Sequence, residues 1–277
     1  MTEFIGLDDL LLAALREDIG TGDITTLSCV PAEARSKARF VAKQDGVICG
    51  SFIPARVYCL LGGDITVKTF VKDGKKVKKG DVIATVEGSS RRMLTGERVA
   101  LNFFQHLSGI ATQTNAAVSR VAGTNAKIID TRKTTPGLRE LEKYAVRTGG
   151  GANHRFGLSD GVLIKDNHIK AAGGITAAVE SARALAPHTL KIEVETESFE
   201  QIVEALEAKA EIIMLDNMST EQMAEAVRLI NGRALTEASG NMGERDLFAV
   251  AETGVDFISI GALTHTVQAL DISLKFE

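Results

Sequence analysis

From about residue 127 onward the chain repeats one unit: a short apolar strand, a polar or glycine-containing turn and an amphipathic helix. The strands are AKIIDTRK, GVLIKDN, LKIEVET, EIIMLDN, ALTEASG and FISIGAL. Strands that alternate with helices of this length form a parallel sheet, because each helix carries the chain back to the edge where the next strand begins. Six units are fewer than the eight of a complete α/β barrel, so the repeat fits either a reduced α/β barrel or an open, doubly wound sheet.

Two local signals refine this expectation. No GxGxxG follows the first strand, which weighs against a dinucleotide-binding sheet. Two of the helices begin with capping-box spacing, Ser198 to Gln201 and Ser219 to Gln222.

The residues before the repeat have a different pattern of apolar and polar residues. Residues 7–17 have the apolar spacing of a helix that ends before GTGD, and residues 38–87 alternate apolar and polar residues around Asp-Gly and Lys-Gly turns. A long helical pattern follows at 97–121. We therefore predict an N-terminal α+β domain over residues 1–110 and an α/β domain over residues 111–265.

The composition excludes several classes of protein. The net charge is -4 and the sequence pI is near 5.8, so general binding to nucleic acid or to an anionic membrane is not expected. No run approaches the roughly 18 apolar residues of a membrane helix, and residues 1–6 lack the pattern of a signal peptide. Cys29, Cys49 and Cys59 are an odd number without CxxC spacing, which disfavours a disulfide framework or a zinc site and favours a reducing cytoplasm.

Polar residues and glycines follow every strand of the repeat. They are Asp130 to Lys133, Lys165 to Asn167, Glu193 to Thr196, Asp216 and Asn217, Ser239 to Asn241, and Gly261 with Ala262. In a parallel α/β sheet, ligands bind where the strands end and the βα loops begin. For any one strand, such residues can simply mark where the chain meets solvent. Because all six strands have them, we predict that they converge on one site.

These residues divide into three kinds of chemistry. A basic cluster of Arg132, Lys133, His154, Arg155 and Lys165 suits carboxylates and phosphates. Glu195 and Asp216, on neighbouring strands, are oxygen ligands suited to Mg²⁺ held together with substrate phosphates. The segments SGNMG and IGAL offer backbone N–H groups to an anion.

Structural interpretations compete with some of these assignments. Lys165 could belong to an ion pair that only stabilises the fold, and His154 could only cap a turn after three glycines. Glu193 and Glu195 lie on one face of a strand, so one can be functional and the other its supporting partner. The lysine-rich segment 72–80 is typical of a solvated hairpin.

At these residues the sequence resembles the quinolinate phosphoribosyltransferase family. The resemblance rests on DTRKTTPGLRELEKYAVRTGGGANHRFGLSDGVLIKDNH, with KIEVET, MLDN, EASGNM, SIGALTH, EDIGTGDIT and GERVALNFFQHLSGIAT. It runs over nearly the whole chain and is weakest over residues 38–87. It implies an N-terminal α/β sandwich-like domain, completed by the C-terminal residues 266–277, and an incomplete α/β barrel of about six strands that carries the site.

The resemblance also implies a reaction and the residues that serve it. The family joins quinolinate to 5-phosphoribosyl 1-pyrophosphate (PRPP) with Mg²⁺, giving nicotinate mononucleotide, pyrophosphate and carbon dioxide, a step of de novo NAD synthesis. By matching motifs, the quinolinate residues are Arg132, His154, Arg155 and Lys165, with Thr131 also at the substrates. Lys133 is expected between the two substrates, Glu195 and Asp216 at the ribose, pyrophosphate and metal, and Ser239, Gly240, Asn241, Gly261 and Ala262 at the 5-phosphate. The family is dimeric, and the residue that matches Arg98 reaches into the neighbouring subunit's site.

Elementary chemistry supports this expectation. The pyridine nitrogen attacks the ribosyl carbon as pyrophosphate leaves, so positive charge develops on the sugar and negative charge on the leaving group. Positioning and charge, with Glu195 beside the sugar, are expected to supply the rate rather than a covalent nucleophile. The alternatives are the same scaffold with nicotinate as acceptor, a lipoyl or biotinyl carrier built on DGKKVKKGDVIATVEG, and a Schiff-base aldolase using Lys133 or Lys165.

Overall fold

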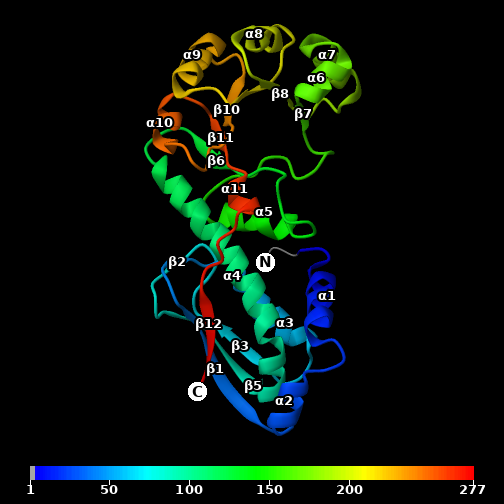
Figure 1. Ribbon diagram of the computed structural model, residues 1–277, viewed down its shortest axis with the longest axis vertical. Helices are drawn as coiled ribbons and strands as arrows, with labels where there is room; N and C mark the ends of the chain where they lie inside the picture. The colour runs from blue at the N-terminus through cyan, green and yellow to red at the C-terminus, as the bar shows by residue number, and fades with distance from the viewer. Residues whose placement is uncertain (1–3) are drawn as a thin grey trace. The chain divides into compact units, whose positions relative to one another are not determined.

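The structure is a computed structural model that describes residues 4–277. The chain forms two compact units (Figure 1). The first contains residues 4–115, 135–150 and 267–277, and the second contains residues 116–134 and 151–266. Residues 135–150 lie within the second domain as the sequence-based boundaries drew it, but they pack with the first unit.

The first unit is built on a four-stranded antiparallel sheet. Its strand order is β12 (Ile272–Phe276), β1 (Arg35–Ala42), β5 (Val82–Ser89) and β3 (Thr66–Thr69). A separate pair joins β2 (Gly46–Val47) to β4 (Lys76–Val77). The helices of this unit are α1 (Leu7–Ile19), α2 (Ile24–Cys29), α3 (Ile53–Leu60), the first part of α4 (Ser90–Arg120) and α5 (Arg139–Thr148). The C-terminal strand β12 therefore completes a sheet formed by N-terminal strands.

The core of the first unit lies between this sheet and α4. Alternate residues of β1, such as Phe40, are fully buried because a strand directs every second side chain to the same face. Phe40 meets the Phe104 ring of α4 edge to face, with centroids 6.3 Å apart. The alternation read from the sequence over residues 38–87 thus corresponds to a half-buried sheet.

The second unit is a six-stranded parallel sheet. The strand order is β6 (Lys127–Ile129), β11 (Phe257–Ser259), β10 (Leu235–Ser239), β9 (Ile212–Asp216), β8 (Ile192–Thr196) and β7 (Val162–Ile164). From β7 to β11 each new strand is added on the same side of the last, and β6 lies beside β11. A doubly wound sheet reverses this direction at a switch point. The order is that of an incomplete barrel, which decides between the two architectures that fit the sequence.

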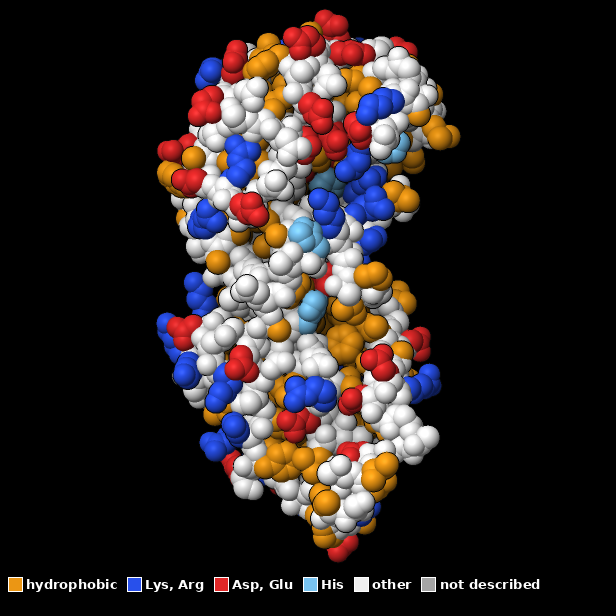
Figure 2. Space-filling view, in the orientation of Figure 1, with side chains coloured by type: hydrophobic (Ala, Val, Ile, Leu, Met, Phe, Trp, Pro, Cys, Tyr) orange, Lys and Arg blue, Asp and Glu red, His pale blue; other side chains and the backbone are white. Residues whose placement is uncertain are grey.

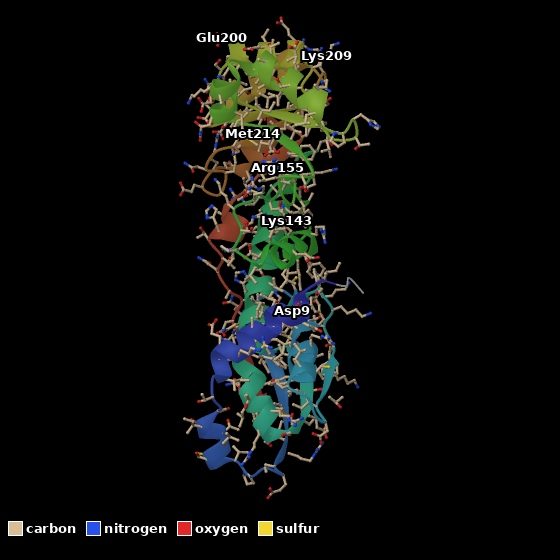
Figure 3. All side chains as sticks on the ribbon, turned by 90° about the vertical axis from the view of Figure 1, so that its right-hand side faces the viewer. Asp9, Lys143, Arg155, Glu200, Lys209 and Met214 are labelled. Atoms are coloured by element: carbon tan, nitrogen blue, oxygen red, sulfur yellow. The ribbon has the colours of Figure 1, made fainter. Side chains whose placement is uncertain are left out.

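Helices connect these strands on the outside of the sheet (Figure 1). They are α6 (Asp166–Ala172), α7 (Ile175–Leu185), α8 (Phe199–Glu207), α9 (Thr220–Ile230) and α10 (Leu247–Glu252), whereas the short α11 (Ala262–His265) follows β11, the last strand of this sheet, and leads to β12. Both predicted capping serines accept a hydrogen bond from the backbone of the third residue into the helix, and Ser219 with Gln222 forms a complete capping box. Figure 3 labels Glu200 in the first turn of α8 and Lys209 just beyond its end, at the outer side of the unit.

The inner face of this sheet is unusually polar. Glu193 and Glu195 are two positions apart on β8, and Glu237 and Ser239 are two positions apart on β10. The two side chains of each pair therefore point to the same face of the sheet. In complete barrels of this type, layers of branched apolar side chains fill the interior. The polar residues therefore indicate that the interior here serves ligand binding as well as packing. Over the described residues 4–277, no helix is long and apolar enough to cross a membrane.

Candidate active site

A cavity of about 600 Å³ lies in the second unit at the carboxyl ends of the strands. The predicted site residues that line it are Thr131, Lys133, Lys165, Glu195, Asp216, Ser239, Gly240, Asn241, Gly261 and Ala262. Figure 2 shows Lys and Arg side chains gathered beside Asp and Glu side chains on the second unit's part of this face. Residues that are up to about 130 positions apart in the sequence thus share one cavity, because parallel strands end at the same edge.

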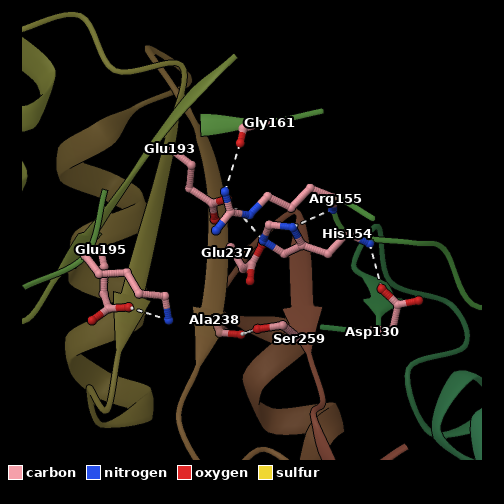
Figure 4. A network of polar contacts seen from close by, with 10 residues as sticks. Asp130, His154, Arg155, Gly161, Glu193, Glu195, Glu237, Ala238 and Ser259 are labelled. Atoms are coloured by element: carbon pink, nitrogen blue, oxygen red, sulfur yellow. Dashed lines mark hydrogen bonds and ion pairs between the residues drawn. The ribbon is translucent and has the colours of Figure 1, made fainter. Parts of the chain in front are cut away.

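Lys165 and Glu195 form an ion pair in the wall of this cavity. Lys165 follows β7, and its Nζ lies 3.5 Å from Oε2 of Glu195 on the next strand (Figure 4). Burial raises the pKa of Glu195, the Lys165 ammonium opposes this effect, and the Asp216 carboxylate adds to it. The Lys165 side chain remains 47% exposed, so the ion pair still faces solvent and a ligand.

Asp216 is held by the residue that follows it. Asn217 has a left-handed backbone (φ 56°), and its side-chain amide donates to Oδ2 of Asp216 over 2.6 Å. Its backbone N–H donates to the carbonyl of Ser239. Gly240 comes so close that a Cβ there would lie 2.8 Å from the Asn217 nitrogen, and its own φ is +96°. Only glycine fits this contact between the β9 and β10 loops.

Lys133 is fixed by backbone contacts on both sides. Its N–H donates to the Thr131 hydroxyl, and its carbonyl accepts from the Thr264 hydroxyl over 2.8 Å. A Cβ on Gly261 would lie 3.1 Å from Cδ of Lys133, so the absence of a side chain there leaves a path for the lysine stem. The exposed lysine thus extends from a loop whose backbone is hydrogen-bonded on both sides.

His154 and Arg155, which the sequence analysis grouped with Lys133 and Lys165 in one basic cluster, instead line a second cavity of about 520 Å³ in the same unit. Nε2 of His154 lies 3.1 Å from Glu193 and 3.7 Å from Glu237, and both of these glutamates are buried (Figure 4). Burial, and then the charge of Glu193, raise the pKa of Glu237 well above its ordinary value. The histidine therefore does more than cap a turn, since its ring is packed against two interior carboxyl groups.

Arg155 is the most enclosed of the predicted arginines. Burial, and then the charge of Arg132, lower its pKa, whereas Glu193 raises it. Its Nη1 donates to the Gly161 carbonyl over 2.9 Å. Figure 3 labels Arg155 within the second unit, below the β9 residue Met214. Arg132 is exposed and acts on Arg155 electrostatically, so these two guanidinium groups form one positive region.

Some residues of the site were missed, and one was located elsewhere. His265 lines the first cavity, although the sequence analysis gave it no role, and Asn217, which was predicted only as one of the converging strand-end residues, lines it as well. Arg98 lies in the first unit, exposed on α4, and its contribution to a neighbouring subunit stays a prediction.

Two groups of carboxylates have a spacing that bears on metal binding. Glu195 and Asp216 line one cavity and interact electrostatically, and such oxygen ligands fit Mg²⁺ bound together with a phosphate-bearing substrate. The other group is His154, Glu193 and Glu237, whose nearest ligand atoms lie within 4.8 Å of one another. Among the residues that the structure describes, this is the only cluster of three or more such groups.

Comparison with known proteins gives consistent results over the whole chain. Residues 23–108 match the family described as quinolinate phosphoribosyl transferase, N-terminal domain, and residues 110–275 match its C-terminal domain. A probable nicotinate-nucleotide pyrophosphorylase (carboxylating) of Synechocystis is 48% identical over 275 residues, covering 98% of this chain and 93% of that protein. The protein of the same description from Bacillus subtilis is 48% identical over 268 residues, covering 97% and 92%.

Solved structures are similar in the same way. NadC from Streptococcus pyogenes has a TM-score of 0.92 and 44% identity, with 100% of both chains covered. Nicotinate-nucleotide pyrophosphorylase from Ehrlichia chaffeensis has a TM-score of 0.95 and 39% identity, again with full coverage of both chains.

Proposed function

Because the chain belongs to the quinolinate phosphoribosyltransferase family, we propose that it joins quinolinate to PRPP, forming nicotinate mononucleotide, pyrophosphate and carbon dioxide in de novo NAD synthesis. The observation that carries this proposal is the cavity at the strand ends, where Lys133 and Lys165 face Glu195 and Asp216. Cations and carboxylates are both needed there, because the substrates are anionic and positive charge develops on the sugar.

The two carboxylates of quinolinate would be bound by the positive region. Arg132 and Arg155 offer planar guanidinium groups that can bind a carboxylate with two hydrogen bonds. Lys165, which lines the first cavity, would add a point charge. That His154 binds quinolinate stays a prediction. Thr131 lines the first cavity, and its contact with a substrate also stays a prediction.

PRPP would occupy the first cavity. The 5-phosphate would lie against the loops Ser239 to Asn241 and Gly261 to Ala262, where glycines let the backbone approach a ligand closely. Glu195 and Asp216 would hold Mg²⁺ through the pyrophosphate. When bound, the metal ion would supply positive charge that neutralises the pyrophosphate.

The residues of the chain can support the reaction in two stages. In the first, the ring nitrogen bonds to the ribosyl carbon while the bond to pyrophosphate breaks. Lys133 neutralises the leaving group, and Glu195 stabilises positive charge on the sugar. In the second, the alkylated ring accepts the electron pair of the breaking bond as the adjacent carboxylate leaves as carbon dioxide, and a proton replaces it.

The assembly and the cellular location are also proposals. A homodimer in which Arg98 enters the partner's site is supported by the exposure of this arginine on α4. A reducing cytoplasm is supported by the cysteines, since Cys29, Cys49 and Cys59 are all free thiols.

Lys133→Ala and Asp216→Ala test the assignment of this cavity. Each should reduce formation of nicotinate mononucleotide from quinolinate, PRPP and Mg²⁺ by at least about a hundredfold, because a charge facing the transition state is lost. Lys170→Ala, which removes an exposed lysine paired with Asp166 on α6, is the control and should keep full activity. Near wild-type turnover in either cavity variant, with unchanged thermal unfolding, would contradict the proposal.

The second candidate reaction uses nicotinate as the acceptor. The pairing of Arg132 with Arg155, supplemented by Lys165, favours an acid with two carboxylates over an acid with one. In a competition assay, quinolinate should therefore be consumed first. Preferential consumption of nicotinate would identify the second candidate as the correct one.

A further inference from the structure

The proposed reaction leaves two buried carboxyl groups without a role. Glu193 on β8 and Glu237 on β10 are 3% and 2% exposed, and Oε1 of each has no hydrogen-bond partner. Buried polar atoms are nearly always paired, so exceptions require a reason. The group that both carboxyls approach is the His154 ring (Figure 4).

The hydrogen bonds of His154 define where its proton lies. Nδ1 accepts the backbone N–H of Arg155 over 2.7 Å, so Nδ1 must present a lone pair. A neutral ring then carries its proton on Nε2, which lies 3.1 Å from Oε2 of Glu193. A carboxylate that accepts from one ring nitrogen fixes both the tautomer and the orientation of an imidazole. Glu193 is placed to do this for His154.

The His154 ring is in turn hydrogen-bonded to the backbone of Arg155. The oriented ring holds the Arg155 backbone, and the guanidinium is anchored at its far end by the Gly161 carbonyl. Nε of Arg155 is buried and has no hydrogen-bond partner, and the residue lines the 520 Å³ cavity, where its guanidinium can meet a ligand. A shift of the His154 ring would move the backbone that carries this guanidinium.

We propose that Glu193 is a positioning residue for quinolinate recognition: through His154, it fixes the place where the Arg155 guanidinium meets the substrate. This inference rests on the proposed function, in which Arg155 binds a carboxylate of quinolinate. Glu237 provides a comparison, because it is buried at a similar depth but its Oε2 lies 3.7 Å from the same ring nitrogen, beyond hydrogen-bond distance, while its carboxyl group contacts Glu193 rather than orienting the ring.

Two substitutions of Glu193 separate hydrogen bonding from charge. Glu193→Leu removes the acceptor, and we expect KM for quinolinate to rise roughly tenfold, about 1.4 kcal/mol, the size of one lost hydrogen bond. Glu193→Gln keeps an acceptor and removes a negative charge near an anionic substrate, so KM for quinolinate should stay at the wild-type value or fall. In both variants KM for PRPP and kcat should change by less than about twofold.

The same measurements define the results that overturn the proposal. Glu237→Leu should raise KM for quinolinate by less than about threefold, because no hydrogen bond to the ring is lost. Equal effects of the two leucine variants, or an unchanged KM in Glu193→Leu, would contradict the proposal. A similar loss in Glu193→Gln would mean that charge, rather than positioning, is the function of Glu193.

A double-mutant cycle tests whether Glu193 acts through His154. In a His154→Ala background, Glu193→Leu should cause no further rise in KM for quinolinate, since the residue that it orients is gone. Independent, multiplicative effects of the two substitutions would overturn the proposal. Wild-type activity is the reference: failure of the wild-type protein to convert quinolinate would refute the proposed function itself, whereas an active wild type with unaffected variants would refute only the positioning role.

Two measurements on wild-type protein do not depend on how the variants fold. Nitrogen NMR of the histidine side chains, with His154 assigned by its absence in His154→Ala, should show a neutral ring protonated on Nε2. A proton on Nδ1 would contradict the proposal. Metal analysis should find no divalent ion bound at His154, Glu193 and Glu237, because one stoichiometric ion that is lost in Glu193→Leu would make Glu193 a ligand instead.

Discussion

Replacing Gly240 with alanine tests the loop contact that shapes the PRPP cavity. The residue has a φ of +96°, and a Cβ added to it would meet Asn217. A left-handed backbone costs a non-glycine residue about 1–2 kcal/mol. Forcing an extra methyl group into a packed site costs about 1–3 kcal/mol more. The Asn217 side chain can turn away, but its backbone nitrogen, 2.8 Å from the new Cβ, cannot move without moving the chain.

We therefore expect Gly240→Ala to lower the free energy of unfolding by about 2–5 kcal/mol, the sum of these two costs. Because Asn217 donates to Asp216, the displacement should also reach the carboxylate proposed to serve PRPP. KM for PRPP should rise at least about tenfold, equivalent to about 1.4 kcal/mol of binding free energy. Urea unfolding and initial-rate kinetics measure the two effects.

Gly123→Ala is the matched control. Gly123 lies in the same unit with a φ of +90°, and a Cβ there would meet nothing within 4 Å. The free energy of unfolding of Gly123→Ala should fall only by the conformational cost of about 1–2 kcal/mol. Both KM values should stay unchanged. If Gly240→Ala were as stable as Gly123→Ala and bound PRPP normally, the reasoning about this contact would be refuted.

Three further predictions concern stability, pH and the sugar site. Phe104→Ala should lower the free energy of unfolding by about 3–5 kcal/mol in urea titrations, because a fully buried ring is removed; a loss below about 1 kcal/mol would contradict its place in the core. Hydrogen bonds from Thr26 lower the pKa of Asp23, so this carboxylate stabilises the folded protein above its ordinary pKa, and that contribution is lost as the pH falls through the lowered value. Asp23→Asn keeps an N-cap acceptor, so its stability deficit at neutral pH should shrink in acid; a deficit independent of pH would refute the role of charge. Glu195→Gln should reduce kcat with little change in KM for quinolinate, and the opposite pattern would exclude a role at the sugar.

Much of the second unit could be predicted from the sequence because its signals are local. Each strand is a short apolar run, each helix has its own periodicity, and Ser198 and Ser219 mark two helix starts. The convergence of Lys133, Lys165, Glu195 and Asp216 follows from strand direction alone. Whether the sheet is a barrel or doubly wound depends on which strands become neighbours, and no local pattern encodes this.

The unpredicted parts depend on contacts between distant residues. The sequence located Glu193 and Glu195 on one face but could not assign their roles. In the structure, Glu195 is two residues closer to the strand end and meets Lys165, whereas Glu193 lies deeper and meets His154. The packing of residues 135–150 with the first unit is likewise a tertiary preference. Its helix, α5, has the same amphipathic pattern as the helices of the second unit.

The most direct test follows the carboxyl carbon next to the ring nitrogen of quinolinate. With that carbon radiolabelled, and with PRPP and Mg²⁺ present, the purified protein should release one labelled carbon dioxide for each nicotinate mononucleotide and each pyrophosphate formed. Omission of PRPP should abolish the release, since the ring must be alkylated before the carboxylate can leave. Labelled carbon dioxide without PRPP, or a mononucleotide that keeps the label, would contradict phosphoribosyl transfer followed by decarboxylation at this site.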